Sequence, residues 1–200
     1  MEITIIRHGK THGNKIGRYN GTIDDPLCEE GMLQAKNAGS MKRVKHVFVT
    51  PLSRTQQTAS ICFENASQTV VEGLREMCFG DFEGRTADEM KDDKAYIAWL
   101  ESNWALPCPN GESRTEFSMR VSKAFGEIVD LCLEKGEKEA FVVAHGGTIM
   151  GIMSTLTRSP NDYFDYFCQN CTGYKITIDK ELWQSKRIFS DFERVDKLSD

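Results

Sequence analysis

The sequence lacks several features that would place the protein in a specialised class. Its 200 residues carry 25 lysines and arginines against 30 aspartates and glutamates, a net charge of −5, without a basic tract. Nucleic-acid binding depends on clustered cations, so this composition argues against a nucleic-acid partner. No apolar run approaches the ~18 residues that a membrane-spanning helix needs, and the N-terminus lacks the pattern of a signal peptide. We therefore expect a cytoplasmic protein without a membrane partner.

The seven cysteines also lack the spacing of a disulfide framework, so we expect reduced thiols. Cys168 and Cys171 form a Cys-x-x-Cys pair, but no second ligand pair follows them, which favours a structural over a metal-binding or redox interpretation. No internal repeat, linker or low-complexity stretch divides the chain. We therefore predict a single domain over residues 1–200, long enough to bury a substantial core.

Three short apolar runs indicate buried strands, and each is followed by an arginine or a histidine. Residues 3–6 precede Arg7 and His8, residues 47–49 precede Arg54 by a few positions, and residues 140–144 precede His145. In an open α/β sheet, ligands bind beyond the carboxyl ends of the strands, so we expect these groups at one edge. An acidic chain with cations gathered at one site suits a small anion.

The remaining pattern alternates strands with helices and indicates an α/β protein. Helices are predicted over residues 30–42, 53–63, 93–102, 112–135 and 148–156, with another opening at Thr86, and further strands over residues 69–71, 171–178 and 183–189. Residues 11–14 are predicted as a polar turn and Ser159-Pro160 as a break. Together these elements predict a three-layer α/β/α sandwich with a mostly parallel central sheet and a C-terminal hairpin at one edge.

Arg7, His8 and Gly9 have complementary chemistry at the end of the first strand. A guanidinium grips an anion with a fixed fork of donors, and a glycine permits close backbone approach. An imidazole near neutral pH can be a base, a ligand or a nucleophile. The tripeptide alone is equally compatible with a structural role. The other two strand ends are what favour a catalytic interpretation.

Four segments together resemble the histidine phosphatase, or phosphoglycerate mutase-like, superfamily. They are residues 7–11 with Asn14, residues 53–59, Glu76 ahead of residues 80–84, and residues 145–147. The resemblance covers almost the whole chain in the order that the family uses. It implies the phosphoglycerate mutase-like fold, which agrees with the three-layer sandwich predicted from the pattern of elements.

The resemblance also implies a division of roles. His8 would attack phosphorus and become a phosphohistidine, while Arg7, Arg54 and His145 would hold the phosphoryl oxygens. Glu76 would protonate the leaving alkoxide and then activate water. Further substrate contacts would come from Asn14, Asn20, Gly21 and Gly147. Neither a metal nor a cofactor is required, and the partner would be a small phosphate ester.

Physical chemistry places conditions on these roles. A phosphate monoester carries a charge of about −1.5 to −2, which two arginines and one protonatable histidine can balance. His8 needs a backbone carbonyl or similar partner at one ring nitrogen so that the other stays unprotonated, and His145 must be able to carry charge. Glu76 can act as an acid near neutral pH only if its pKa is raised.

Three functions share these residues. The stretch between Glu76 and His145 is short for a mutase, which favours hydrolysis over phosphoglycerate mutase-type transfer. Residues 19–27 and 99–113 resemble the α-ribazole phosphatase branch of the family. A non-catalytic module that binds phosphorylated ligands is the third alternative, and the intact catalytic set argues against it. The sequence gives no indication of the oligomeric state.

A few positions near the expected site have uncertain roles. Lys10 departs from the acidic or amide residue common in the family and adds a positive charge near the pocket. An apolar lid over the pocket is one interpretation of three aromatic residues, and ordinary helix packing is the simpler one; they are Tyr96, Trp99 and Trp104. His12 and His46 have no supporting motif, and His46 is expected at the surface.

Overall fold

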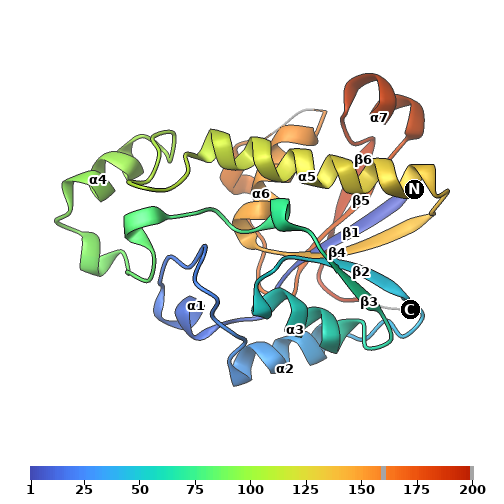
Figure 1. Cartoon of the computed structure of the whole chain (residues 1–200), viewed down its shortest axis with the longest axis horizontal. Helices are drawn as coiled ribbons and strands as arrows, with labels where there is room; N and C mark the ends of the chain where they lie inside the picture. Colours follow the sequence, from blue (N-terminus) through green and yellow to red (C-terminus); the bar gives the residue numbers. More distant parts are fainter. Residues whose placement is uncertain (159–160, 199–200) are drawn as a thin grey trace.

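A six-stranded sheet with the strand order β3-β2-β4-β1-β5-β6 forms the centre of the computed structural model, which describes residues 1–158 and 161–198 (Figure 1). The strands are β1 (Glu2–Arg7), β2 (His46–Val49), β3 (Ser67–Val70), β4 (Glu139–Ala144), β5 (Gly173–Thr177) and β6 (Asp191–Val195). The first four are parallel, β5 is antiparallel to β1, and β6 is antiparallel to β5. The predicted mostly parallel sheet is confirmed.

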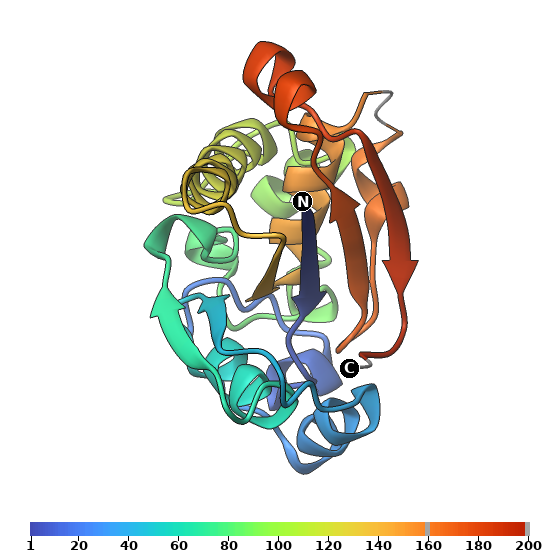
Figure 2. The same ribbon diagram turned by 90° about the vertical axis from the view of Figure 1, so that its right-hand side faces the viewer.

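Helices cover both faces of the sheet, which confirms the predicted three layers. Helices α2 (Glu29–Ala38) and α3 (Ser53–Cys62) lie on one face, and α5 (Arg114–Glu134) and α6 (Gly146–Leu156) lie on the other (Figures 1 and 2). Each face of the sheet has its own apolar core, and alternate side chains of β4 pack into the two. Val142 packs in the core beneath α5 and α6, and Val143 in the core beneath α2 and α3. This alternation follows from the two-residue period of a strand that is buried on both faces.

Shorter helical elements connect these layers. They are α1 (His12–Ile16), η1 (Glu72–Leu74), η2 (Gly80–Phe82), η3 (Asp88–Met90), α4 (Lys94–Glu101), η4 (Tyr163–Tyr166) and α7 (Lys180–Lys186). The segment from η1 to α4 extends past the carboxyl ends of the strands, so it forms a cap at the left of Figure 1. The expected site edge of the sheet therefore faces this cap.

Strand register brings the predicted site residues to that edge. Arg7 pairs with Ala144 across β1 and β4, and Val49 pairs with Val143 across β2 and β4. The residues that follow these strands, His8, Thr50 and His145, therefore leave the sheet side by side. The expectation that three strands deliver their polar groups to one edge is confirmed.

Residues 183–189 do not form the predicted strand. Residues 180–186 form α7, where the side chain of Asp179 accepts a hydrogen bond from the Leu182 amide and caps the helix. Buried Trp183 and Phe189, with ring centroids 6.3 Å apart, give the apolar pattern that suggested a strand. A hairpin does lie at the edge of the sheet, but its second strand is β6 at residues 191–195.

Two other predictions differ locally from the structure. Residues 11–14 are not a simple turn, because Thr11 and Asn14 form a reciprocal capping box that begins α1. Thr86 and Glu89 are hydrogen bonded as a cap, but the helical element that Glu89 belongs to is the single turn of η3 and not a longer helix. The predicted break at Ser159-Pro160 lies outside the described residues.

All seven cysteines are free thiols, and Cys168 and Cys171 are both buried. Burial raises the pKa of the Cys168 thiol to about 11 and that of Cys171 to about 12. Neither thiol therefore has the thiolate character that redox reactivity requires. Within residues 1–158 and 161–198, no helix combines the length and apolar character needed to cross a membrane.

Trp183→Ala should strongly destabilise the fold. Its indole is 0% exposed and donates from Nε1 to Asp130 Oδ1 on α5 over 2.9 Å. Loss of a buried tryptophan removes about 3–5 kcal/mol of unfolding free energy, measured by urea denaturation. Leu33→Ala is the control, because that side chain is 58% exposed on α2 and its loss should change stability by about 0.5 kcal/mol or less. Equal effects would contradict the role given to Trp183.

Candidate active site

His8 lies just after the carboxyl end of β1, and one of its ring nitrogens is engaged in a hydrogen bond. Its Nδ1 lies 2.7 Å from the carbonyl oxygen of Gly9, so Nδ1 carries the proton and donates it, and Nε2 is left as the unprotonated nitrogen. The Gly9 peptide is itself held, because its N–H donates to Thr58 Oγ1 on α3 over 2.9 Å. Sequence reasoning required a carbonyl partner of this kind, and the structure contains it.

The surroundings of His8 keep the ring neutral. The side chain is only 4% exposed, and burial is the main cause that holds its pKa well below the usual value, followed by the charges of Arg54 and Arg7. Protonation would place a third positive charge beside two guanidiniums in a dry site. This neutral form is the one that a nucleophilic role for His8 would require.

His145, at the end of β4, is held in the opposite tautomer. Arg54 Nε donates to His145 Nδ1 over 3.2 Å, and His145 Nε2 lies 2.9 Å from Thr50 Oγ1 and donates to it. The ring is 0% exposed, and burial followed by the Arg54 charge holds its pKa well below the usual value. The sequence analysis required a His145 that can carry charge, whereas this arrangement holds it neutral.

Arg54 is almost completely enclosed, with 2% of its surface exposed. Besides His145, its guanidinium donates to the backbone carbonyls of Asn20, Gly21 and Ile23 over 2.8–3.2 Å. Four of its five donors are therefore satisfied within the part of the chain that the structure describes. Its charge still acts on both histidines, because both lie in the same low-dielectric region.

Arg7 is the more available cation. Its Nη1 donates to the carbonyl of Cys168 over 3.0 Å, but its buried Nε has no hydrogen-bond partner among the described residues. An unsatisfied buried donor costs about 1–3 kcal/mol, more when it is charged. A phosphoryl oxygen beside Arg7 would remove that cost, so the structure provides a reason for anion binding at this point.

Glu76 approaches the site from the loop after η1. Its carboxylate accepts from the amides of Met77 at Oε1 and Gly147 at Oε2, over 2.9 and 3.0 Å. A Cβ atom at position 147 would lie 2.3 Å from Oε1, so only glycine permits this approach. Burial raises the pKa of the Glu76 carboxyl, against the opposing effects of these hydrogen bonds and of two arginines. The raised pKa is what a general acid requires.

A cavity of about 160 Å³ lies beside this cluster: Arg7 and Glu76 line it, whereas His8, Arg54 and His145 do not. Its polar lining includes Arg7, Asn14, Asn20, Glu76 and Gly147. Its apolar lining consists of aromatic and methionine side chains: Tyr19, Met77, Phe79, Trp104, Met150, Tyr163 and Phe167. Of the three aromatics considered for a lid, Trp104 lines this cavity, whereas Tyr96 and Trp99 are buried behind it, as ordinary helix packing predicts.

Of the four predicted substrate contacts, Asn14, Asn20 and Gly147 line the cavity and Gly21 does not. Asn14 uses its amide oxygen to accept from the Thr11 amide, which leaves its Nδ2 donors for the cavity that it lines. Asn20 also lines the cavity, and its buried Oδ1 has no partner among the described residues. Gly21 does not line the cavity, and its N–H donates to the Glu83 carboxylate over 2.9 Å.

Sequence reasoning missed the role of Glu83. Its carboxylate accepts from the backbone amides of Gly21, Thr22 and Phe79 over 2.9–3.2 Å, and so joins the loop after α1 to the loop after Glu76. The glutamate stands inside a motif that the sequence analysis used. Gly21 and Thr22 are about sixty positions away along the chain, and no local signal indicated these two partners.

Two other positions resolve questions from the sequence. Lys10 forms an ion pair with Glu30, which partly compensates its charge, and it does not line the cavity.

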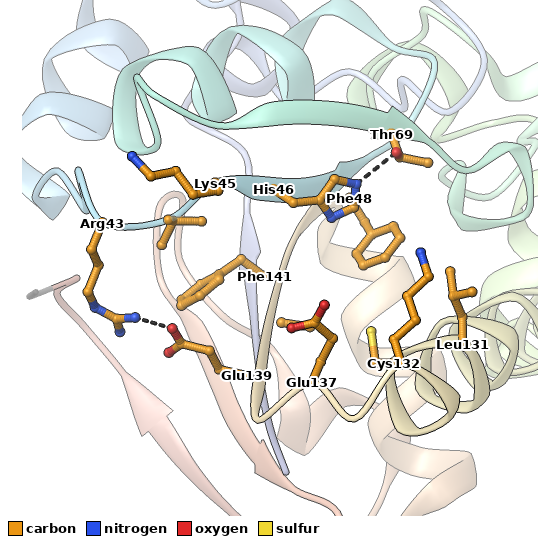
Figure 3. Close-up of a pocket in the computed structure, with 13 residues that line it drawn as sticks. Arg43, Lys45, His46, Phe48, Thr69, Leu131, Cys132, Glu137, Glu139 and Phe141 are labelled. Carbon is orange, nitrogen blue, oxygen red and sulfur yellow. Dashed lines mark hydrogen bonds and ion pairs between the residues drawn. The ribbon is translucent and has the colours of Figure 1, made fainter.

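His46 is exposed, as expected, and lines a different cavity of about 390 Å³ near the amino ends of β2 and β4 (Figure 3). Although larger, that cavity contains none of the predicted site residues, and its rim mixes both charges, with Arg43 paired to Glu139.

The comparisons with known proteins identify the family of this chain. The chain matches the family model of the histidine phosphatase superfamily (branch 1) over residues 3–191, so it belongs to that family. It is 30% identical over 210 residues to adenosylcobalamin/α-ribazole phosphatase of Salmonella typhimurium, an alignment that covers 92% of this chain and 99% of the relative. It is 31% identical over 192 residues to the Yersinia pestis protein named probable phosphoglycerate mutase GpmB, covering 92% and 87%.

Solved structures show the same fold. YhfR of Bacillus stearothermophilus is similar with a TM-score of 0.82 and 25% sequence identity, covering 99% of this chain and 98% of that one. The relatives are thus named as phosphatases and mutases, which supports an enzyme of one of these two kinds. Among residues 1–158 and 161–198, no three His, Cys, Asp or Glu side chains are grouped as metal ligands.

Acidification should expose the cost of keeping His145 neutral. Its folded-state pKa lies below the unfolded value of about 6.5, so the unfolded state binds more protons and stability falls as pH drops below about 6.5. The loss is at most about 1.4 kcal/mol per pH unit for each such histidine. His145→Gln should therefore lose less unfolding free energy than wild type between pH 7 and pH 5, measured by urea denaturation of the ligand-free protein.

His12→Gln is the matched control, because it makes the same substitution at an exposed histidine outside the buried cluster. The raised pKa of Glu76 has the opposite sign, since the folded state then binds more protons above about pH 4.5. That contribution is common to all three proteins and cancels in the comparison. A His145→Gln slope equal to that of wild type would contradict the neutral, buried state of the ring.

Proposed function

We propose that this protein is a metal-independent phosphomonoester hydrolase that acts through a phosphohistidine on a small phosphorylated metabolite. The observation that carries the proposal is the state of His8, whose Nδ1 is held by the Gly9 carbonyl and whose Nε2 is left unprotonated beside two arginines. The Glu76 carboxyl, whose pKa is raised by burial, lines the 160 Å³ cavity together with Arg7. Nucleophile, cations and acid are the components that phosphoryl transfer requires.

The first chemical step forms the phosphoenzyme. His8 Nε2 attacks phosphorus and the ester P–O bond breaks, while the proton of Glu76 passes to the leaving alkoxide. In the second step Glu76, now a carboxylate, takes a proton from water as the water oxygen attacks phosphorus. The N–P bond then breaks, inorganic phosphate leaves, and both side chains return to their starting states.

Cations lower the barrier of both steps. The transferring group spreads negative charge over its non-bridging oxygens, so fixed positive groups stabilise the transition state. Arg7 offers an unsatisfied Nε donor at the cavity, and Arg54 adds a charge that is oriented by backbone carbonyls. In this proposal the two guanidiniums supply the positive charge that a metal ion supplies in other phosphatases.

The lining of the cavity favours an ester with an apolar or aromatic group. Trp104 stacks on the buried Trp99, with ring centroids 4.5 Å apart and planes 19° from parallel. Its backbone φ of 64° lies in the left-handed region, which costs about 1–3 kcal/mol for a residue with a side chain. The fold therefore tolerates strain to hold this indole at the cavity. With the name of the Salmonella relative, this lining makes α-ribazole phosphate the first substrate to test.

His8→Ala should abolish turnover of an aryl phosphate in EDTA. Removal of the nucleophile leaves only binding and charge stabilisation, so kcat should fall by about 1000-fold or more. Release of nitrophenolate from p-nitrophenyl phosphate measures the rate. His12→Ala is the control four positions away, exposed and outside the cavity, and it should retain wild-type activity.

The same preparation tests the alternatives. Turnover that survives in His8→Ala, or that EDTA abolishes in wild type, would contradict the proposed mechanism. Isomerisation of phosphoglycerate at a rate above hydrolysis would favour the mutase named among the relatives. No turnover of any ester, with binding of inorganic phosphate retained, would favour a binding module.

Trp104→Ala should lower activity on large esters more than activity on small ones. For a bulky aryl phosphate, kcat/KM should fall by about 10-fold, because the ester group loses an aromatic contact, whereas glycerol phosphate should be little affected. Leu106→Ala is the control, since that neighbour is exposed and does not line the cavity. Equal losses on large and small esters would exclude a role for Trp104 in recognising the ester group.

A further inference from the structure

The segment that carries Glu76 has no strand beside it to fix its path. Residues 73–78 begin within η1, after β3, and lead into the cap, and they are outside the six paired strands. Their backbone groups are satisfied instead by side chains and by the loop before α5. Thr148 on α6 donates to the carbonyls of Leu74 and Arg75 over 3.1 and 3.4 Å. The remaining contacts converge on one arginine.

That arginine is Arg120, which projects from the second turn of α5. Its Nη1 donates to the carbonyls of Gly73 and Arg75 over 2.9 and 3.2 Å, and its Nη2 donates to the carbonyl of Glu76 itself over 3.2 Å. One planar group therefore fixes three carbonyls within four consecutive residues. The rigid fork of a guanidinium suits this task, and the point charge of a lysine does not.

Glu112 completes the arrangement from the other side. Arg120 Nε donates to Glu112 Oε1 over 2.7 Å and Arg120 Nη2 to Oε2 over 2.8 Å, a bidentate pair. Oε2 also accepts from the Cys78 amide over 2.9 Å, and the Glu112 amide donates to the Cys78 carbonyl over 2.9 Å. The pair thus holds the chain on both sides of Glu76, at residues 73–76 and at residue 78.

We infer that Arg120, oriented by Glu112, is a positioning residue that sets the carboxyl of Glu76 against the leaving group and the attacking water. Arg120 touches no reacting atom, and it does not line the cavity. It acts through the backbone, because the path of residues 73–78 decides where the Glu76 side chain begins. The inference rests on the proposed function, in which Glu76 supplies the proton to the leaving alkoxide.

The inference predicts a dependence on the leaving group that a structural role does not. An alkyl alkoxide cannot leave without a proton, whereas nitrophenolate leaves without one. Because kcat/KM reports all steps up to the first irreversible one, it measures departure of the leaving group and is independent of the later attack by water. Displacement of a catalytic group by about 1 Å costs on the order of 100-fold in rate.

Arg120→Met removes all five donors and keeps an unbranched side chain. It should lower kcat/KM for an alkyl phosphate by about 100-fold and for p-nitrophenyl phosphate by a far smaller factor. Arg187→Met is the matched control, because Arg187 also forms a bidentate pair with a carboxylate on α5, at Asp130, over 2.6 and 2.8 Å. That control should leave the ratio of the two substrates at the wild-type value.

Two further variants decide the question if Arg120→Met does not fold. Arg120→Lys keeps the charge but loses the fork, and Glu112→Gln keeps an acceptor for the Cys78 amide but weakens the bidentate pair. Both should also lower the alkyl-to-aryl ratio. A ratio unchanged from wild type in every folded variant would overturn this inference alone. Absence of turnover in wild type with both esters would overturn the proposed function, and this inference with it.

Discussion

The burial of Arg54 is the constraint on which the rest of the site depends. A guanidinium removed from water costs several kcal/mol unless its donors are satisfied. Carbonyls of Asn20, Gly21 and Ile23 satisfy them, so the loop after α1 must fold over the arginine. Glu83 then holds that loop against the segment after Glu76 by accepting from backbone amides on both. One buried cation thus determines the shape of two loops far apart in the sequence.

Burial acts on the two histidines and the glutamate of the site in a consistent direction. It lowers the pKa of His8 and His145 and raises that of Glu76, so all three are moved toward their neutral forms. The arginines keep their charge because a guanidinium does not lose its proton in proteins. The site therefore presents net positive charge before a ligand enters. This balance complements an ester of charge about −1.5 to −2.

The sequence predicts the parts of this site that depend on local pattern. Apolar runs of four to five residues located the strands at residues 3–6 and 140–144, and parallel pairing placed the following histidines at one edge. The strand assigned to residues 183–189 was wrong because Trp183 is buried in a short helix whose apolar spacing resembles a strand. A helix of seven residues carries too few turns for the 3.6-residue period to decide between the two.

The parts that the sequence does not predict are those that join distant segments. The sequence predicts a long helix over residues 112–135 and gives Arg120 no further role, yet its side chain satisfies carbonyls about forty-five positions earlier. Glu83 and Glu112 likewise accept from backbone amides whose positions only the fold determines. A charged side chain that hydrogen bonds to the backbone gives no signal in periodicity or composition, because residues of any type can supply the backbone partner. Such residues are found only by following the hydrogen bonds of the structure.

The neutral state of His145 is compatible with the charged role that the sequence analysis required of it. In the proposed reaction, a phosphoryl group of charge about −1.5 to −2 enters beside the ring, and a nearby negative charge favours the protonated form. Protonation at Nδ1 removes the acceptor that Arg54 Nε uses in the ligand-free structure. Protonation therefore frees the Nε donor of Arg54 and also turns His145 Nδ1 into a donor. In this proposal substrate binding and proton uptake are therefore linked, because the anion favours the protonation that supplies these two donors.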